Sequence, residues 1–260
     1  MEVEENIQPD EPTQHYGKRV YIYFAALLCV VLVTLLVKGK WQAHVLVHQI
    51  TVEGINIISK DEVIQLMKIP SNVSMYDLDL TILQQNILAN SFVKRAVVKR
   101  DSPSMLRVEI EERKPAAILG GNELHYIDDE GVLLPYLSTT ETYDIPVISG
   151  IDSASNFQAG QKIMNTDVQE ALEIIRSSRT IGENLFHSIS EIRLHREHDI
   201  LLYSFETGVP IIFGKGDVTK KMVKLDAFWQ KFLQNSDTKE IQYIDIRFDD
   251  QVVVSRKTTS

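Results

Sequence analysis

The chain has 260 residues, enough for one or two domains of ordinary size. It carries 27 Lys and Arg residues against 36 Asp and Glu residues. The resulting net charge of −9 argues against a nucleic-acid-binding protein, because such proteins usually present a basic surface. Hydrophobic residues make up 44% of the chain, which is enough for a core, and the one cysteine excludes an internal disulfide and a cysteine-based zinc site.

Residues 20–37 form an uncharged apolar segment that begins at Val20 and ends at Val37. As a helix it spans about 27 Å, close to the ~30 Å hydrocarbon core of a bilayer. It is longer than the apolar part of a signal peptide, and no small-residue cleavage site follows it. We therefore expect an uncleaved transmembrane signal anchor. Residues 1–19 contain too few apolar residues to fold, so we expect a disordered tail.

The flanking charges do not decide the orientation of this anchor. Lys18 and Arg19 precede the segment and Lys38 and Lys40 follow it, so the count of basic residues is tied. The absence of cysteine beyond Cys29 suits an oxidising compartment, and a short N-terminal tail is usual for a signal anchor. Both features favour a cytoplasmic N-terminus, with the bulk of the chain across the membrane.

The next part of the chain predicts a compact α+β module in the order β-α-α-β-β. Alternating apolar and polar residues predict its three strands, at 47–53, 92–100 and 105–111. A capping box at residues 59–62 opens a first helix, which ends before Pro70, and apolar spacing predicts a second helix over 79–90. Both helices can pack on one face of a three-stranded sheet.

Beyond Pro115 the sequence predicts a mainly antiparallel β-domain with flanking helices, over residues 116–256. Strand patterns occur at 117–119, 123–127, 132–134, 189–195, 200–205, 209–213, 241–248 and 251–256. Apolar residues at helical spacing predict two helices, over 167–178 and 217–233. The inner face of the first carries Val168, Ala171, Leu172 and Ile175, and the second carries Trp229 in its apolar stripe.

Motifs for catalysis and metal binding are weak throughout the chain. His195-Arg196-Glu197-His198 offers no third ligand, Gly214-Lys215-Gly216 lacks the full phosphate-loop pattern, and Asp128-Asp129-Glu130 is typical of a turn. We therefore predict no catalytic residue, no metal site and no cofactor. A membrane-anchored envelope enzyme, such as a peptidoglycan hydrolase, stays an alternative, because 36 acids allow many carboxylate pairs.

The last apolar segment, residues 241–254, is the strongest candidate for a binding site. Ile244, Ile246 and Phe248 are expected on one face, with Tyr243, Asp245 and Arg247 on the other. An apolar strand this close to a polar C-terminus is a candidate sheet edge, which either receives a partner strand or pairs internally. The sequence alone leaves both possibilities open.

Five segments, in order along the chain, carry a resemblance to a known family. They are Ile50–Gly54, Ser102–Ala117 with its L-x-V-x-I-x-E-R-x-P core, Tyr126–Val132, Ile145–Gly150 and Ile244–Phe248. Together they resemble the FtsQ/DivIB family of bacterial cell-division proteins, in which a POTRA module precedes a β-domain. The resemblance covers residues 45–254 and implies a POTRA domain over 45–115.

The resemblance also implies a function. It indicates a non-enzymatic, bitopic protein of the bacterial inner membrane at the division septum, with its bulk in the periplasm. Such a protein would bind FtsB/DivIC-like and FtsL-like coiled-coil proteins and other divisome components, and would regulate septal peptidoglycan synthesis. A POTRA-bearing secretion component is a further alternative.

The FtsB-like partner would add a strand to the C-terminal sheet edge, beside the helix before it. The expected contact residues are Arg247, Phe248, Val252, Val253, Val254 and Trp229. Arg247 is the residue expected to pair with an acid of the partner.

Overall fold

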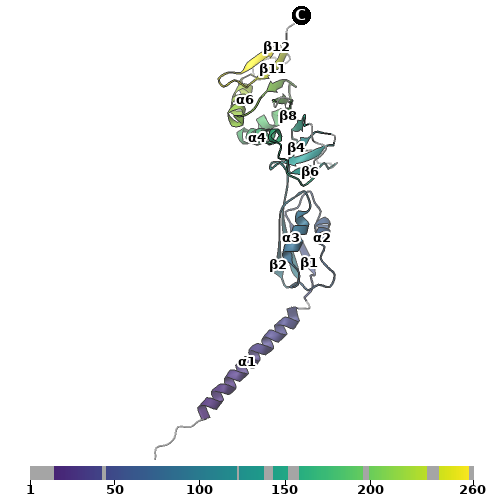
Figure 1. Ribbon diagram of the computed structural model, residues 1–260, viewed down its shortest axis with the longest axis vertical. Coiled ribbons are helices and arrows are strands. Elements are labelled where there is room, and N and C mark those ends of the chain that lie inside the picture. The colour runs from purple at the N-terminus through teal and green to yellow at the C-terminus, as the bar shows by residue number, and fades with distance from the viewer. Residues whose placement is uncertain are drawn as a thin grey trace, which may run out of the picture.

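The computed structural model describes residues 15–42, 45–121, 123–137, 143–151, 158–195, 199–232 and 240–257. Figure 1 shows three parts in chain order along the long axis: a helix, a small domain and a larger domain that contains the C-terminus. Most of the expected N-terminal tail and His195-Arg196-Glu197-His198 beyond its first residue lie outside the described residues.

The first helix, α1 (His15–Gln42), contains the expected anchor segment. Its side chains are described from Val20 to Leu36. The large apolar side chains among them are exposed to solvent, for example Val20 at 57% and Leu36 at 63%. Within the described part of the chain, no helix meets the length and hydropathy required of a membrane span. The anchor therefore stays a prediction.

The small domain has the predicted order β-α-α-β-β. Its elements are β1 (Gln49–Glu53), α2 (Lys60–Met67), α3 (Leu80–Leu88), β2 (Val93–Ser102) and β3 (Met105–Glu112). β3 is the central strand of the sheet, parallel to β1 and antiparallel to β2. Ser59 caps α2 by accepting a hydrogen bond from the Glu62 backbone N–H, and Asp79 caps α3 in the same way. The capping box was thus a correct signal.

The larger domain is built on one nine-stranded sheet. Its strands are β4 (Pro115–Leu119), β5 (His125–Asp128), β6 (Leu133–Pro135), β7 (Val147–Ser149), β8 (Ile189–Leu194), β9 (Ile200–Ser204), β10 (Pro210–Ile212), β11 (Ile241–Asp245) and β12 (Val253–Arg256). Their order across the sheet is β12-β11-β10-β9-β8-β7-β4-β5-β6. Five neighbouring pairs are antiparallel, whereas β4·β7, β7·β8 and β10·β11 are parallel. The sheet is therefore more mixed than the sequence indicated.

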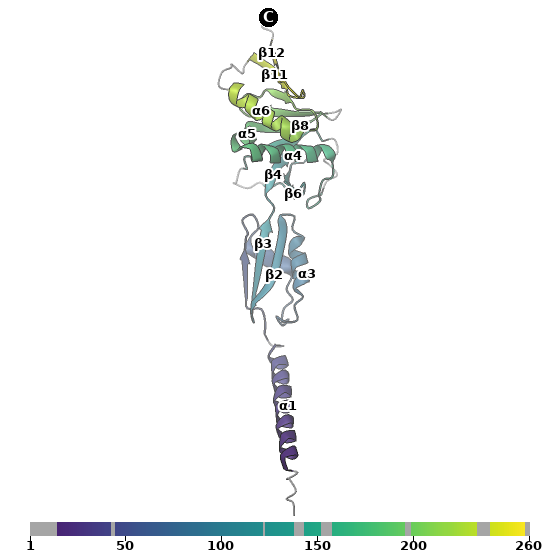
Figure 2. The same ribbon diagram turned by 90° about the vertical axis from the view of Figure 1, so that its left-hand side faces the viewer.

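Three helices pack on one face of this sheet (Figure 2): α4 (Thr166–Ile181), α5 (Glu183–Ser188) and α6 (Val218–Phe232). The predicted inner face of α4 is confirmed, because its four apolar residues are at most 1% exposed. Opposite them lies a row of register partners across five strands, namely Ile192, Leu202, Ile211, Ile244 and Val254. This shared core fixes the position of α6 beside β11 and β12.

The two domains meet at an ion-pair cluster. Arg113, which follows β3, lies 2.6 Å from the carboxylate of Asp128 and 2.8 Å from that of Glu130, both at the β5–β6 turn. Lys94 of β2 lies 2.9 Å from Glu130. Asp128 is buried and also accepts hydrogen bonds from the backbone N–H groups of Glu130 and Val132. The acidic turn therefore joins the domains, which is a structural role.

The sequence did not predict β7 or α5, and the strand predicted over 241–248 is longer than the one observed. β7 has three residues and α5 has six, too few to show a hydrophobic period. The strand expected over 241–248 ends at Asp245, because the Asp245 carboxylate accepts a hydrogen bond from the Arg247 backbone N–H at 3.0 Å. This local turn takes the chain out of the sheet, so Phe248 does not lie in a strand.

Candidate functional site

β12 lies at one end of the nine-stranded sheet. It pairs antiparallel with β11, and in the described part of the chain no strand pairs with its other side. The opposite end of the sheet is different, because the Leu133 N–H of β6 donates to the Gln161 carbonyl and the Leu133 carbonyl accepts from Gly160. The β6 edge is thus covered by a loop. The strand predicted near the C-terminus therefore lies at a sheet edge and pairs internally, with β11, along one side.

The register shows which backbone groups of β12 point outward. The Lys257 N–H donates to the Glu240 carbonyl, toward β11, and the Ile246 N–H donates to the Ile212 carbonyl, toward β10. Since successive residues of a strand point their backbone groups to opposite sides, Val253 and Ser255 face β11. The N–H and C=O groups of Val254 and Arg256 therefore face away from the sheet. These two residues form the edge available for strand pairing.

Lys224 of α6 holds the turn between β11 and β12, and Lys220 contacts the same turn through an exposed ion pair. The Lys224 ammonium donates to the backbone carbonyl of Ile246 at 2.8 Å and also to that of Phe248. One helical turn earlier, the Lys220 ammonium lies 3.0 Å from the carboxylate of Asp249. Their spacing of four residues puts both cations on the same side of α6. The helix thus fixes the position of the turn from which β12 begins.

Arg247 is held by carboxylates of its own chain. Its guanidinium contacts Asp245 at 2.8 to 3.2 Å and lies 3.6 Å from Asp199, while its aliphatic part packs against Gly214. Burial alone would raise the pKa of Asp245, but hydrogen bonds from Arg247 hold that pKa below its ordinary value. Gly214 has a φ of +68° and a Cβ there would lie 2.8 Å from the Arg247 side chain. The residue expected to pair with a partner therefore already has two acidic neighbours.

The apolar residues of the predicted site divide into two groups. Phe248 is 45% exposed and Val253 is 37% exposed, so both are accessible to a partner. Val252, Val254 and Trp229 are half-buried and pack against the core. Trp229 also lines a groove between α5 and α6. The structure thus brings residues 247–254 together beside α6, and assigns Trp229 a largely structural position.

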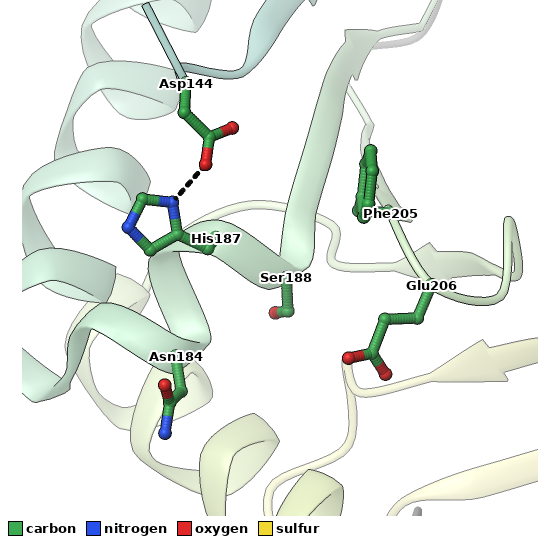
Figure 3. A pocket seen from close by; sticks show the side chains of 6 residues that line it. All are labelled: Asp144, Asn184, His187, Ser188, Phe205 and Glu206. Carbon is green, nitrogen blue, oxygen red and sulfur yellow. Dashed lines mark ion pairs between the residues drawn. The ribbon is translucent and has the colours of Figure 1, made fainter.

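The groove lined by Trp229 is a second candidate site. It has two adjoining halves of about 310 and 430 Å³ that share Asn184, Ser188 and Glu206. Figure 3 shows the first half, where the Glu206 carboxylate is directed toward Ser188 and Asn184. His187 lies 2.7 Å from Asp144 through Nδ1 and 3.4 Å from Glu183 through Nε2. The Ser188 hydroxyl donates to the Leu185 carbonyl, so His187 does not activate it as a nucleophile.

The weaker motifs have structural roles wherever they are described. Lys215 of Gly214-Lys215-Gly216 pairs with Asp167 of α4, and the Gly216 N–H donates to Glu170, so this segment joins α4 to the start of α6. Among the described residues, no group of three or more His, Cys, Asp or Glu side chains is placed to hold a metal ion.

The fold and the edge together define a class of protein: a POTRA-type domain followed by a β-domain whose terminal strand, among the described residues, is paired along one side only. Models of known families agree with this class. The "POTRA domain, FtsQ-type" model matches residues 45–113, and the "FtsQ/DivIB, C-terminal related" model matches residues 114–255. The chain belongs to the FtsQ/DivIB family, as its motifs indicated.

Relatives match this chain in sequence over most of their length. The cell division protein FtsQ of Geotalea daltonii is 26% identical over 211 residues, which cover 80% of this chain and 75% of the relative. FtsQ of Geobacter sp. strain M21 is 26% identical over 226 residues, covering 84% and 81% respectively. FtsQ of Syntrophotalea carbinolica is 27% identical over 210 residues, covering 80% and 73%. These matches support a role in cell division.

The sequence interpretation missed Lys220, Lys224 and Glu206. The lysines carried a usable signal, because their spacing of four residues places them on one side of the predicted helix. Glu206 carried none, since it lies in a turn and meets Trp229 only through the packing of α6 against the sheet. The contacts of such residues depend on tertiary structure, which local sequence patterns do not specify.

Proposed function

We propose that the chain is a non-enzymatic scaffold of the division machinery. It is a bitopic protein of the bacterial inner membrane at the septum, anchored by residues 20–37, with its bulk in the periplasm. It binds an FtsB/DivIC-like partner, and with it an FtsL-like protein, through the free edge of β12. Through these contacts it regulates septal peptidoglycan synthesis.

The observation that carries this proposal is the outer edge of β12, with which no strand of the described residues pairs. Its outward N–H and C=O groups, on Val254 and Arg256, match the pairing pattern that a partner strand requires. An apolar edge strand left unpaired invites aggregation, and natural proteins usually cover it or charge it. The loop beside β6 covers the other edge of the same sheet. A partner strand on β12 supplies the missing cover.

The backbone and the side chains at the edge contribute differently to recognition of the partner. Backbone hydrogen bonds supply affinity without much selectivity, whereas the exposed Phe248 and Val253 side chains contact the partner directly. A partner acid that approaches Arg247 competes with Asp245 and Asp199. Arg247 therefore favours a partner whose acidic side chain fits beside these two carboxylates. Its contribution is to the specificity of binding rather than to the affinity.

The exposed apolar side chains of α1 support the membrane anchor. Tyr21, Phe24 and Leu28 are about as exposed as Val20 and Leu36, so no described part of the chain covers this helix. A lipid bilayer provides the apolar surroundings that such side chains require.

A pair of proline variants tests the edge. Val254→Pro removes an outward N–H and leaves the β11 pairing intact, so it should abolish binding of the FtsB-like periplasmic segment while the domain stays folded. Val254→Ala removes the side chain but keeps the N–H, and should retain measurable binding. Val253→Pro breaks a bond to β11 and should instead destabilise the domain. Normal binding by a folded Val254→Pro variant would place the partner site elsewhere.

A further inference from the structure

The groove between α5 and α6 has a chemical character that the strand edge does not share. Its lining includes three carboxylates, on Asp144, Glu206 and Asp226, and of the described residues that line it none is a lysine or an arginine. His187 lies beside Asp144, so Glu206 and Asp226 are the carboxylates without a basic neighbour in the lining. An opening of this kind concentrates negative potential, because low-dielectric walls focus the field of the charges. The groove therefore favours a cationic occupant.

Glu206 lies at the centre of this arrangement, because it lines both halves of the groove. Its carboxylate and the side-chain amide of Asn184 have no hydrogen-bond partner among the described residues. Asp226, in contrast, accepts a hydrogen bond from Gln230 at 2.8 Å. Glu206 and Asn184 thus present an anionic acceptor and an amide that are both available to a ligand.

Aromatic rings line both halves of the groove. Phe205 lines one half of the groove and is 77% exposed, and Trp229 lines the other half. A guanidinium group binds carboxylates through paired hydrogen bonds and also stacks on aromatic faces, which an ammonium group does less well. The combination of carboxylates with two aromatic rings therefore favours arginine over lysine.

We propose that this groove binds an arginine-bearing polypeptide segment of a partner protein. The arginine lies between Glu206 and Asp226, and a neighbouring apolar side chain packs against Phe205. The Asn184 amide hydrogen-bonds the backbone of the segment. This contact goes beyond the proposed function, because it uses α5, α6 and the β9–β10 turn rather than the edge of β12.

Binding of a defined pair of peptides to the full chain tests the proposal. The probe is a dye-labelled Gly-Leu-Arg-Leu-Arg-Leu-Gly peptide, measured by fluorescence anisotropy with the chain in a mild non-ionic detergent. The control peptide carries citrulline in place of both arginines, which keeps the shape and removes the charge. We expect the citrulline peptide to bind at least tenfold more weakly, equivalent to about 1.4 kcal/mol.

Matched variants locate the site. Glu206→Gln and Asp226→Asn should each weaken binding of the arginine peptide about three- to tenfold, the range for partly exposed charged pairs. Glu123→Gln makes the same chemical change at an exposed position of the β4–β5 turn and should have no effect beyond about twofold. A photoreactive benzoylphenylalanine in place of Phe205 should crosslink to the arginine peptide.

Several outcomes would overturn the proposal. They are equal binding of the two peptides, unchanged binding by Glu206→Gln, and absence of any binding at millimolar peptide. Val254→Pro separates this site from the strand edge, because it should leave peptide binding unchanged. Loss of peptide binding in Val254→Pro would show that the peptide occupies β12, and would refute the groove without affecting the proposed function.

Discussion

The Lys224 ammonium donates to the backbone carbonyl of Ile246 at 2.8 Å and so ties α6 to the turn that precedes β12. The same ammonium also reaches the carbonyl of Phe248. These carbonyls lie just beyond the end of β11 and take no part in its pairing with β12. The position of the β12 edge therefore depends on a side chain that lies outside the strand.

Replacement of Lys224 should weaken partner binding without unfolding the domain. In Lys224→Met the turn at residues 246–250 loses both hydrogen bonds, so we expect faster amide exchange there and about a three- to tenfold loss of affinity for the FtsB-like segment. Lys224→Arg should restore most of both. The matched control is Lys220→Met, whose exposed pair with Asp249 contributes little. Equal effects of the two Met variants would refute a special role for Lys224.

The junction between the domains should depend strongly on Arg113. Asp128 is 1% exposed, and Arg113→Met leaves its carboxylate buried without a charged partner. We expect the free energy of unfolding to fall by about 3–5 kcal/mol, measured by chemical denaturation. Lys94→Met removes a more exposed partner of Glu130 and should cost about 1 kcal/mol or less. Similar losses in the two variants would mean that the Asp128 pair contributes nothing beyond surface charge.

The same junction makes stability depend on pH. Hydrogen bonds from Arg113 and Lys94 lower the pKa of Glu130 from 4.5 to about 2. A carboxylate with a lowered pKa contributes stability that is fully present above its unfolded pKa and is lost as the pH falls toward the folded value. The difference in unfolding free energy between wild type and Glu130→Gln should thus be constant above about pH 5 and shrink between pH 4.5 and 2. A difference independent of pH in this range would contradict the ion pairs.

Gly150 should tolerate no side chain. It has a φ of +84°, and a Cβ built there would lie 2.0 Å from the Leu194 carbonyl oxygen. The backbone strain alone costs about 1–3 kcal/mol, and the overlap adds to it, so Gly150→Ala should lower the melting temperature markedly. Gly182→Ala is the control, because its φ is 171° and no atom lies within 4 Å of its Cβ. Equal melting temperatures would show that the β7–β8 contact relaxes freely.

Local signals in the sequence predicted the parts of the fold that local physics determines. The cap at Ser59 and the inner face of α4 follow from hydrogen bonding and helical spacing, and the structure contains them. The end of β11 was not predictable in this way. It depends on the Asp245 side chain turning back to the Arg247 N–H, and on Lys224 binding the Ile246 carbonyl from another element.

The candidate site was predicted in outline for a similar reason. An apolar run after a turn identified the final strand, but the direction of its N–H groups depends on the register with β11, which no periodicity specifies. Only the structure therefore distinguishes Val254, whose N–H points outward, from Val253. The groove at Glu206 brings together a turn and a helix that are separated along the chain, so the sequence carried no signal for it.

Amide hydrogen exchange in the complex tests the central claim most directly. In the free chain the N–H of Val254 points away from β11 and that of Val253 faces β11, so Val254 should exchange much faster. Addition of the FtsB-like segment should slow exchange at Val254 and Arg256 strongly and change Val253 little. Rapid exchange at Val254 in the saturated complex would contradict the account, because it would show that no partner strand pairs with the edge of β12.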